Sequence, residues 1–337
     1  MKYAPVIIPT LNRVNHLKRC LDSLANNYFA KETMLLISVD YPPSSKYENG
    51  YNDVLNLLKE YDFSPFLDCR VFYQQTNLGP FANFEFLVKE VSKISDRYIS
   101  TEDDNEFSPC FLEYVNEGLE MYKNNDDIIA VCGGKNPDFI FEDGCNVIFS
   151  KRFFPYGVGS WLSKNKLLEN ECRRVLLGSG YYHNLKTLFK RDRGLFTTYV
   201  LSILCSDSGI YWKSPSQLRL IDSCLSIYMN VTERLCVCPV LSKSRTFGND
   251  GSGYNMKASK DNGSLIIDKS ERFEIYAPKS IIFNESNYKI GAEYLRRKSH
   301  SSKAFILAMF LSVILLLFMG NRRVVIWLFN QIKKHGQ

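Results

Sequence analysis

The sequence predicts an α/β protein with a doubly wound, mostly parallel sheet and a C-terminal helical tail that associates with a membrane. Two observations support this fold class. Through about the first 135 residues, short apolar runs alternate with segments of helical spacing, the βα alternation that produces a parallel sheet. Near the end of the chain, the seventeen residues 304–320 carry no charge, which is about the shortest apolar run that can cross a bilayer.

The elements follow from the spacing of apolar residues. Short runs with β-branched or aromatic residues predict strands, at Pro5–Ile8, Met34–Val39, Cys69–Tyr73, Arg97–Ser100 and Ile128–Val131. Apolar residues three or four apart predict helices between these strands, around Leu17–Leu24, Val54–Leu58, Phe84–Val91 and Phe111–Tyr122. The second half is less regular: we expect helices within 176–196 and 220–229, and glycine-rich loops at 156–161 and 247–253.

The ten cysteines are scattered, and most lie in apolar runs. The one close pair, Cys236-Val237-Cys238, lacks the spacing of a zinc knuckle. No secretory signal precedes the first expected strand, so we expect reduced thiols in a reducing compartment.

The positive charge of the chain is concentrated at one end. The net charge is +6, yet the residues from Ser286 onward carry nine lysines and arginines and one acid, so the rest is near −2. A nucleic-acid-binding domain carries its positive surface on the folded body, and this distribution therefore argues against nucleic acid as a partner. Basic residues flank the apolar run 304–320 on both sides, which fits a simple span poorly. A helix lying in or dipping into an anionic leaflet explains both flanks, and whether the segment spans the membrane stays open.

Three adjacent acids, Glu102, Asp103 and Asp104, follow the expected strand Arg97–Ser100. Open α/β sheets bind ligands at the carboxyl ends of their strands, and three neighbouring carboxylates repel one another unless a cation or hydrogen-bond donors compensate. A solvated acidic turn is the alternative. No glycine-rich fingerprint follows the first strand and there is no P-loop, which disfavours dinucleotide and Walker-type sites.

Four motifs occur in a fixed order: Pro5–Arg13 (PVIIPTLNR), Ser38-Val39-Asp40, Asn77-Leu78-Gly79 and Glu102-Asp103-Asp104. Together they resemble inverting GT-A glycosyltransferases of the family 2 type, and the acidic triplet is similar to that of N-acetylglucosaminyltransferase I. The resemblance covers about 135 residues.

The resemblance implies a domain organisation. A GT-A catalytic domain over 1–260 would comprise a nucleotide-sugar half, 1–135, and an acceptor half, 136–260. A polar and basic connector, 261–303, would then lead to a membrane-associating tail, 304–337.

The resemblance also implies a donor site. Asp104 would bind Mn²⁺ or Mg²⁺, the hard cations that oxygen ligands favour, while Asp103 meets the ribose and Glu102 lies near the donor sugar. The nucleotide pocket would be formed by Pro9, Thr10, Arg13, Asp40, Asn77 and Gly79. Purely structural readings stay open for Pro9 as a strand end, Gly79 as a turn residue and Asn77 as a cap.

The acceptor half would supply the general base that an inverting transfer needs. Asp222 is the expected base, with Asp207 and Asp250 as rivals. Trp161 would stack on an acceptor sugar, although a core tryptophan is nearly as compatible with the sequence.

These expectations describe a metal-dependent inverting glycosyltransferase, of the hexosyltransferase type. It would use a nucleotide diphosphate sugar, a UDP-sugar above others, and a saccharide or lipid-linked saccharide acceptor in polysaccharide biosynthesis. Because the apolar segment follows the catalytic domain, the expected location is the cytoplasmic face of a bacterial cytoplasmic membrane. A catalytically inactive, membrane-tethered sugar-nucleotide-binding protein is the alternative.

Overall fold

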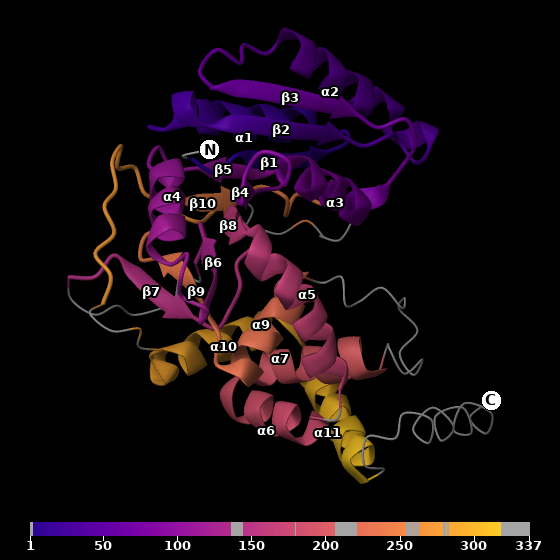
Figure 1. Ribbon diagram of the computed structural model, residues 1–337. Helices are drawn as coiled ribbons and strands as arrows, with labels where there is room; N and C mark the ends of the chain where they lie inside the picture. The colour runs from indigo at the N-terminus through magenta and orange to yellow at the C-terminus, as the bar shows by residue number, and fades with distance from the viewer. Residues whose placement is uncertain are drawn as a thin grey trace.

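The computed structural model describes residues 3–135, 144–178, 180–205, 221–253, 258, 263–278, 281 and 283–317. Its centre is an eight-stranded sheet in the order β3-β2-β1-β4-β8-β6-β9-β7, with helices on both faces (Figure 1). The strands of this sheet are β1 (Val6–Thr10), β2 (Met34–Val39), β3 (Asp68–Tyr73), β4 (Arg97–Ser100), β6 (Ile128–Cys132), β7 (Val147–Ser150), β8 (Val158–Trp161) and β9 (Leu235–Pro239).

The N-terminal part of the sheet is parallel throughout. β1 pairs with β2 and β4, and β2 pairs with β3, all in the same direction. The connecting helices are α1 (Val14–Ala25), α2 (Glu48–Glu60) and α3 (Gly79–Val91), with α4 (Phe111–Met121) following the acidic triplet. The prediction of a mixed α/β protein with a large, mostly parallel sheet is confirmed.

Alternating side chains of β1 explain how helices come to lie on both faces of the sheet. Val6 and Ile8 are buried in the core that includes Leu17 of α1, whereas Ile7 is buried with Leu87 of α3. Successive side chains of a strand point to opposite faces, so a strand that is apolar at every position needs cover on both sides.

The glycine-rich segment expected to be a loop contains a strand instead. β8 runs antiparallel between β4 and β6, in the middle of the sheet. Its Gly159 is required by helix α4, because a Cβ atom there would lie 2.5 Å from Cγ1 of Val115. The close approach of helix and sheet, rather than a turn, accounts for this glycine.

A helical body adjoins the far end of the sheet (Figure 1). It contains α5 (Leu162–Leu177), α6 (Tyr181–Arg191), α7 (Arg193–Thr198), the π-helix η3 (Tyr199–Leu204), α9 (Ile221–Thr232), α10 (Glu285–Ser299) and α11 (Ser302–Leu317). Leu311 and Leu315 of α11 are buried in one cluster with Phe196 and Val200. Residues 302–317 are thus an integral helix of this body rather than a detached tail.

Among the described residues, no single helix is long and apolar enough to cross a membrane. The bent pair Tyr288–Arg297 and Ser302–Leu317 meets the length and composition criteria only when its two helices are taken together.

The segment expected to be a polar connector also contributes to the core. Ile275 is buried against the main sheet cluster, and Phe273 packs on its edge. Arg272 makes an ion pair of 2.8 Å with Glu113 of α4, and the amide of Phe273 donates a hydrogen bond to the same carboxylate. These contacts fasten the segment along α4.

Candidate active site

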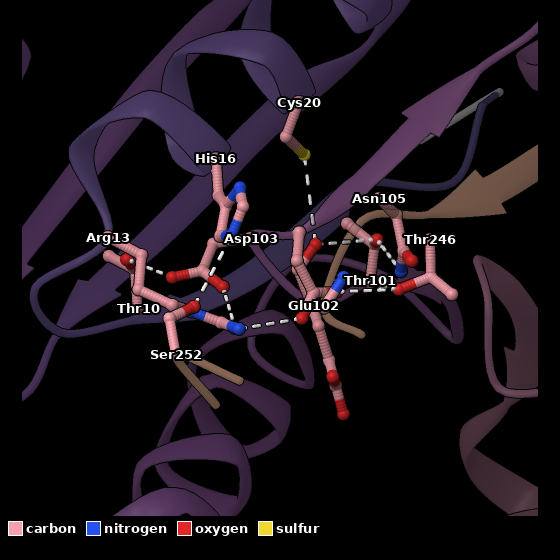
Figure 2. A network of polar contacts seen from close by, with 12 residues as sticks. Thr10, Arg13, His16, Cys20, Thr101, Glu102, Asp103, Asn105, Thr246 and Ser252 are labelled. Atoms are coloured by element: carbon pink, nitrogen blue, oxygen red, sulfur yellow. Dashed lines mark hydrogen bonds and ion pairs between the residues drawn. The ribbon is translucent and has the colours of Figure 1, made fainter. Parts of the chain in front are cut away.

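Two acids of the triplet are bound by one arginine. Arg13, at the start of α1, donates to Oδ2 of Asp104 at 2.8 Å and forms an ion pair with Asp103 (Figure 2). Asp103 also accepts a 2.7 Å hydrogen bond from the hydroxyl of Thr10. Burial lowers the pKa of Arg13, but the two carboxylates outweigh this and raise it above its ordinary value. The guanidinium therefore stays charged and holds both acids in place.

Sheet topology brings these residues together. Thr10 ends β1, and the triplet begins two residues after β4, its parallel neighbour, with Ile7 opposite Ser100. The carboxyl ends of parallel strands meet at one edge of the sheet, where open α/β folds bind their ligands. The structure thus assembles Thr10, Arg13, Asp103 and Asp104 at the expected edge.

Glu102 behaves differently from its two neighbours. Its side chain points away from the Arg13 network (Figure 2) and makes no hydrogen bond to another described residue. Burial of the group within the protein, and then the charges of Asp104 and Asp103, raise its pKa to about 7, against the opposing effect of Arg13. The residue itself is exposed to solvent, so a ligand can reach it.

Asp222, from the other half of the chain, acts electrostatically on Glu102 and Tyr156. It lies in the first turn of α9, and its charge acts on Glu102. Burial, followed by Asp222, Glu102 and Asp104, raises the pKa of the Tyr156 phenol to about 12. Asp222 is therefore near enough to Glu102 and Tyr156 for its charge to raise the pKa of both groups.

A glycine-rich loop covers Asp104. β5 (Asn105–Phe107) and β10 (Ser244–Thr246) form a small antiparallel sheet that ties this loop to the triplet. The amide of Phe247 donates to the carbonyl of Asp104 at 2.8 Å. A Cβ atom on Gly248 would overlap with the Asp104 carboxylate, so only glycine permits this approach.

This packing predicts the effect of a single added methyl group. Gly248→Ala should displace the Asp104 carboxylate and weaken Mn²⁺ binding by about tenfold or more, the scale seen when groups supporting a metal ligand are lost. Gly253→Ala is the matched control, because its Cβ would lie an ordinary 3.5 Å from the Arg13 guanidinium. Calorimetric Mn²⁺ titrations of both variants test this expectation, and equal affinities would contradict it.

Asp250, one of the rival bases, is already engaged. It accepts hydrogen bonds from the amide and hydroxyl of Ser252, and Nε2 of His16 lies 2.9 Å from its Oδ2. Burial raises its pKa, but Ser252 and His16 outweigh this and lower it to about 2. A carboxylate with so low a pKa is a weak general base. The other rival, Asp207, lies outside the described residues.

The Asp40 carboxylate is bound by backbone and side-chain donors of the protein itself. Its carboxylate accepts hydrogen bonds from the amides of Tyr41, Leu78 and Gly79 at 2.8–2.9 Å and from the Asn77 side chain at 3.2 Å. These four bonds fill the acceptor sites of a carboxylate. Asp40 therefore fastens the start of α3 to β2, and its expected contact with the nucleotide stays a prediction.

The other expected nucleotide-pocket residues have clear local roles. Gly79 has φ +78°, a conformation that side chains rarely adopt, and Asn77 also donates to the Tyr41 carbonyl at 2.6 Å. Pro9 lies inside β1, opposite Ser38 of β2, rather than at its end. These contacts leave the ligand-binding roles of Asn77, Gly79 and Pro9 as predictions.

The expected sugar-stacking role of Trp161 is wrong for this structure. Its side chain is only 4 % exposed and lies in the main core. The indole Nε1 donates to the Leu119 carbonyl at 3.1 Å, and the Lys164 ammonium lies 3.8 Å from the ring centre. A ring enclosed on its edge and face cannot receive an acceptor sugar.

Two features were missed from the sequence. The sequence indicates only that Tyr156 belongs to a glycine-rich loop, whereas the fold brings its phenol within reach of the Asp222 charge. Cys132, Cys236 and Cys238 gather within 4.8 Å of one another, buried between β6 and β9. Thiols favour soft metals, whereas Mn²⁺ and Mg²⁺ prefer oxygen, so this cluster is no substitute for the carboxylate site.

The charges around the acidic triplet suit a hard divalent cation. Of the charges that act on Glu102, three are carboxylates and one is the Arg13 guanidinium. Oδ1 of Asp104 has only a weak contact, 3.4 Å from the Thr246 hydroxyl. The neighbouring side chains are oxygen-rich with excess negative charge, which suits a hard cation such as Mn²⁺ or Mg²⁺ at Asp104.

Comparison with known proteins gives little independent support. No family model and no curated protein matches the chain. Two structures of S. aureus TarS align at 15 % identity, with TM-scores of 0.35 and 0.36, over 50 % and 74 % of this chain and 29 % and 61 % of theirs.

A third structure is the mannosyltransferase PcManGT from Pyrobaculum calidifontis in complex with GDP-Man and Mn²⁺. It aligns at 9 % identity and a TM-score of 0.38, over 98 % of this chain and 86 % of its own. The aligned region spans less than two thirds of either TarS chain. Similarity this low does not establish a common fold, and the function is therefore inferred from the residues of this chain.

Proposed function

We propose that the chain is a metal-dependent inverting glycosyltransferase with a GT-A type catalytic domain over residues 1–260. It moves a sugar from a nucleotide diphosphate sugar, a UDP-sugar above others, to a saccharide acceptor. Asp104 is the metal ligand and Asp222 the general base. The observation that carries this proposal is the cluster of Thr10, Arg13, Asp103 and Asp104 at the strand ends, with Asp222 of the other half of the chain near enough for its charge to act on Glu102.

The residues on the donor side have separate proposed roles. Arg13 fixes Asp103 and Asp104, which leaves Oδ1 of Asp104 directed to the Thr246 hydroxyl and free to bind a cation. Asp104 and Glu102 would hold Mn²⁺ or Mg²⁺, which when bound neutralises the charge that develops on a diphosphate leaving group. Asp103, buried against Thr10 and Arg13, positions this set and is the candidate contact for the ribose.

Asp222 carries the acceptor side of the reaction. The acceptor hydroxyl oxygen forms a bond to the anomeric carbon as the bond from that carbon to the diphosphate oxygen breaks. The hydroxyl proton passes to the Asp222 carboxylate, which must lie on the face opposite the leaving group. Tyr156, beside Asp222, is placed to orient the acceptor.

The proposed acceptor is a lipid-linked or surface-glycan saccharide in polysaccharide biosynthesis. The proposed location is the cytoplasmic face of a bacterial cytoplasmic membrane. The support is the apolar and basic C-terminal part of the chain, which would hold the catalytic domain next to a lipid-linked acceptor.

One observation favours the alternative, a catalytically inactive sugar-nucleotide-binding protein. The ion pair of Arg13 with Asp104 already neutralises the expected metal ligand. Such a protein would bind nucleotide without transferring sugar, so turnover separates the two functions.

Nucleotide binding and turnover test the proposal together. UDP with Mn²⁺ should raise the melting temperature more than GDP, CDP or dTDP does, because ligands that bind only the folded state stabilise it. Release of UDP from a matching UDP-sugar, abolished by EDTA, should accompany the shift. Stabilisation without release, over a panel of UDP-sugars and acceptors, would favour the binding protein, and no stabilisation by any nucleotide would refute both functions.

A further inference from the structure

Helix α11 is apolar on the face that the protein does not cover. Its side chains Ala308, Leu311, Ser312 and Leu315 are buried against the helical body. The opposite face exposes Ile306, Leu307, Met309, Phe310, Val313, Leu316 and Leu317. Phe310 is 61 % and Leu317 is 72 % exposed. A surface helix of a soluble protein normally has a polar outer face, so this apolar face indicates an interaction site.

The neighbouring helix α6 adds positive charge. Its exposed side follows helical spacing through Tyr182, Lys186, Phe189 and Lys190, and Arg193 of α7 continues the stripe. The α6 sequence contains no acid. The Phe189 ring stacks with that of Phe305 in α11 at 6.3 Å. We call these two adjoining faces the α6–α11 surface; both helices lie at the same end of the molecule (Figure 1).

We propose that the α6–α11 surface docks on an anionic lipid bilayer, with the outer face of α11 among the acyl chains and the α6 bases on the headgroups. Charge complementarity selects this occupant. Lys186, Lys190, Arg193 and Lys303 are exposed here, and neither α6 nor α11 contains an acid, so a second copy would bring like charges together, whereas an anionic leaflet matches both the bases and the apolar face. Because its other face is packed on the protein, α11 lies along the bilayer rather than across it.

This inference assigns α6 as well as the C-terminal segment to the membrane, and it does not depend on glycosyltransferase activity. The test is co-sedimentation of the full chain with phosphatidylcholine vesicles, with and without phosphatidylglycerol. Lys186→Glu/Lys190→Glu should weaken binding to the anionic vesicles by about tenfold or more, since each base near such a surface contributes about 1 kcal/mol. Phe310→Ser/Val313→Ser should weaken binding to a comparable extent.

The matched control is Lys31→Glu/Lys59→Glu, which makes the same charge change at exposed positions of another region of the protein. This control should bind the vesicles as the parent chain does. Circular dichroism and melting temperature verify that each variant folds.

Three results would overturn the proposal. If the chain binds neutral and anionic vesicles equally and the α6 variant has no effect, insertion of the apolar segment would explain the binding without any contribution from the α6 bases. Equal losses for the control and the α6 variant would indicate an effect of net charge only. A dimer in light scattering that Phe310→Ser/Val313→Ser dissociates would identify the surface as an interface between two copies.

Discussion

Asp104→Asn is expected to abolish metal-dependent sugar transfer while leaving the fold intact. The amide keeps the size of the side chain and an oxygen that can accept from Arg13, but it removes the negative charge that a divalent cation needs. A metal ion contributes several kcal/mol to stabilising a charged leaving group, so we expect a loss of about a hundredfold or more in kcat. Nucleotide release at saturating Mn²⁺ measures the effect.

Asp250→Asn provides the control for Asp104→Asn. Its carboxylate is bound to His16 and Ser252 and is not one of the proposed metal ligands, so its loss should change kcat by far less. Circular dichroism and the melting temperature show whether each variant folds. If Asp104→Asn transfers sugar at the parent rate, and does so in EDTA, the metal assignment is wrong.

The first half of the fold could be predicted because its signals are local. Each strand from β1 to β4 is a short run in which apolar or β-branched residues predominate, and each helix between them repeats its apolar residues at a helical interval. Parallel βα units then fix where the strand ends meet. The clustering of Thr10, Arg13, Asp103 and Asp104 at one edge followed from that topology.

β8 could not be predicted in the same way. Tyr156–Trp161 contains two glycines in six residues, a composition typical of a loop. The reason for Gly159 is the close approach of Val115 on α4, a contact over 40 residues away in the chain. The expectation for Trp161 fails for the same reason. The indole was expected to stack on an acceptor sugar, but strand β8 directs it into the core.

Asp40 shows that a correctly predicted position does not by itself reveal the role of a residue. The sequence placed it at the end of β2, where the structure also has it. Its four hydrogen bonds, however, depend on the backbone amides of Leu78 and Gly79 turning toward it. Backbone donors leave no signature in side-chain identity, so a carboxylate at a strand end can equally bind a ligand or the next helix.

The packing of the C-terminal part could not be predicted from polarity averaged over long segments. Residues 261–303 are polar and basic as a whole, yet a few apolar side chains, Phe273, Ile275, Ala277 and Phe283, pack the segment on the main core. Removing residues from Ala304 onward would likewise expose Leu311 and Leu315, with their partners in the helical body. Such a truncation would test folding as well as membrane binding, and point substitutions on the exposed face are therefore preferred.

Asp222→Asn tests whether Asp222 is the general base. The substitution keeps the size of the side chain and removes its basicity, and Asp222 is close enough for its charge to act on Glu102 and Tyr156. We expect nucleotide and Mn²⁺ to bind as in the parent chain and kcat to fall by about a hundredfold or more, the scale of general-base removal. Asp207→Asn and Asp250→Asn should lose far less, Asp250 because its low pKa makes it a weak base.

Glu102 is the structural rival to Asp222, because its pKa of about 7 suits a general base at neutral pH. Glu102→Gln separates the two roles. If Glu102 holds the cation, Glu102→Gln should weaken Mn²⁺ binding, whereas Asp222→Asn should lower kcat with Mn²⁺ affinity unchanged. A near-normal kcat for Asp222→Asn, together with a collapse of kcat but unchanged Mn²⁺ affinity for Glu102→Gln, would move the base to Glu102. If both variants and the two other aspartate variants turn over normally, a single carboxylate base is not the mechanism.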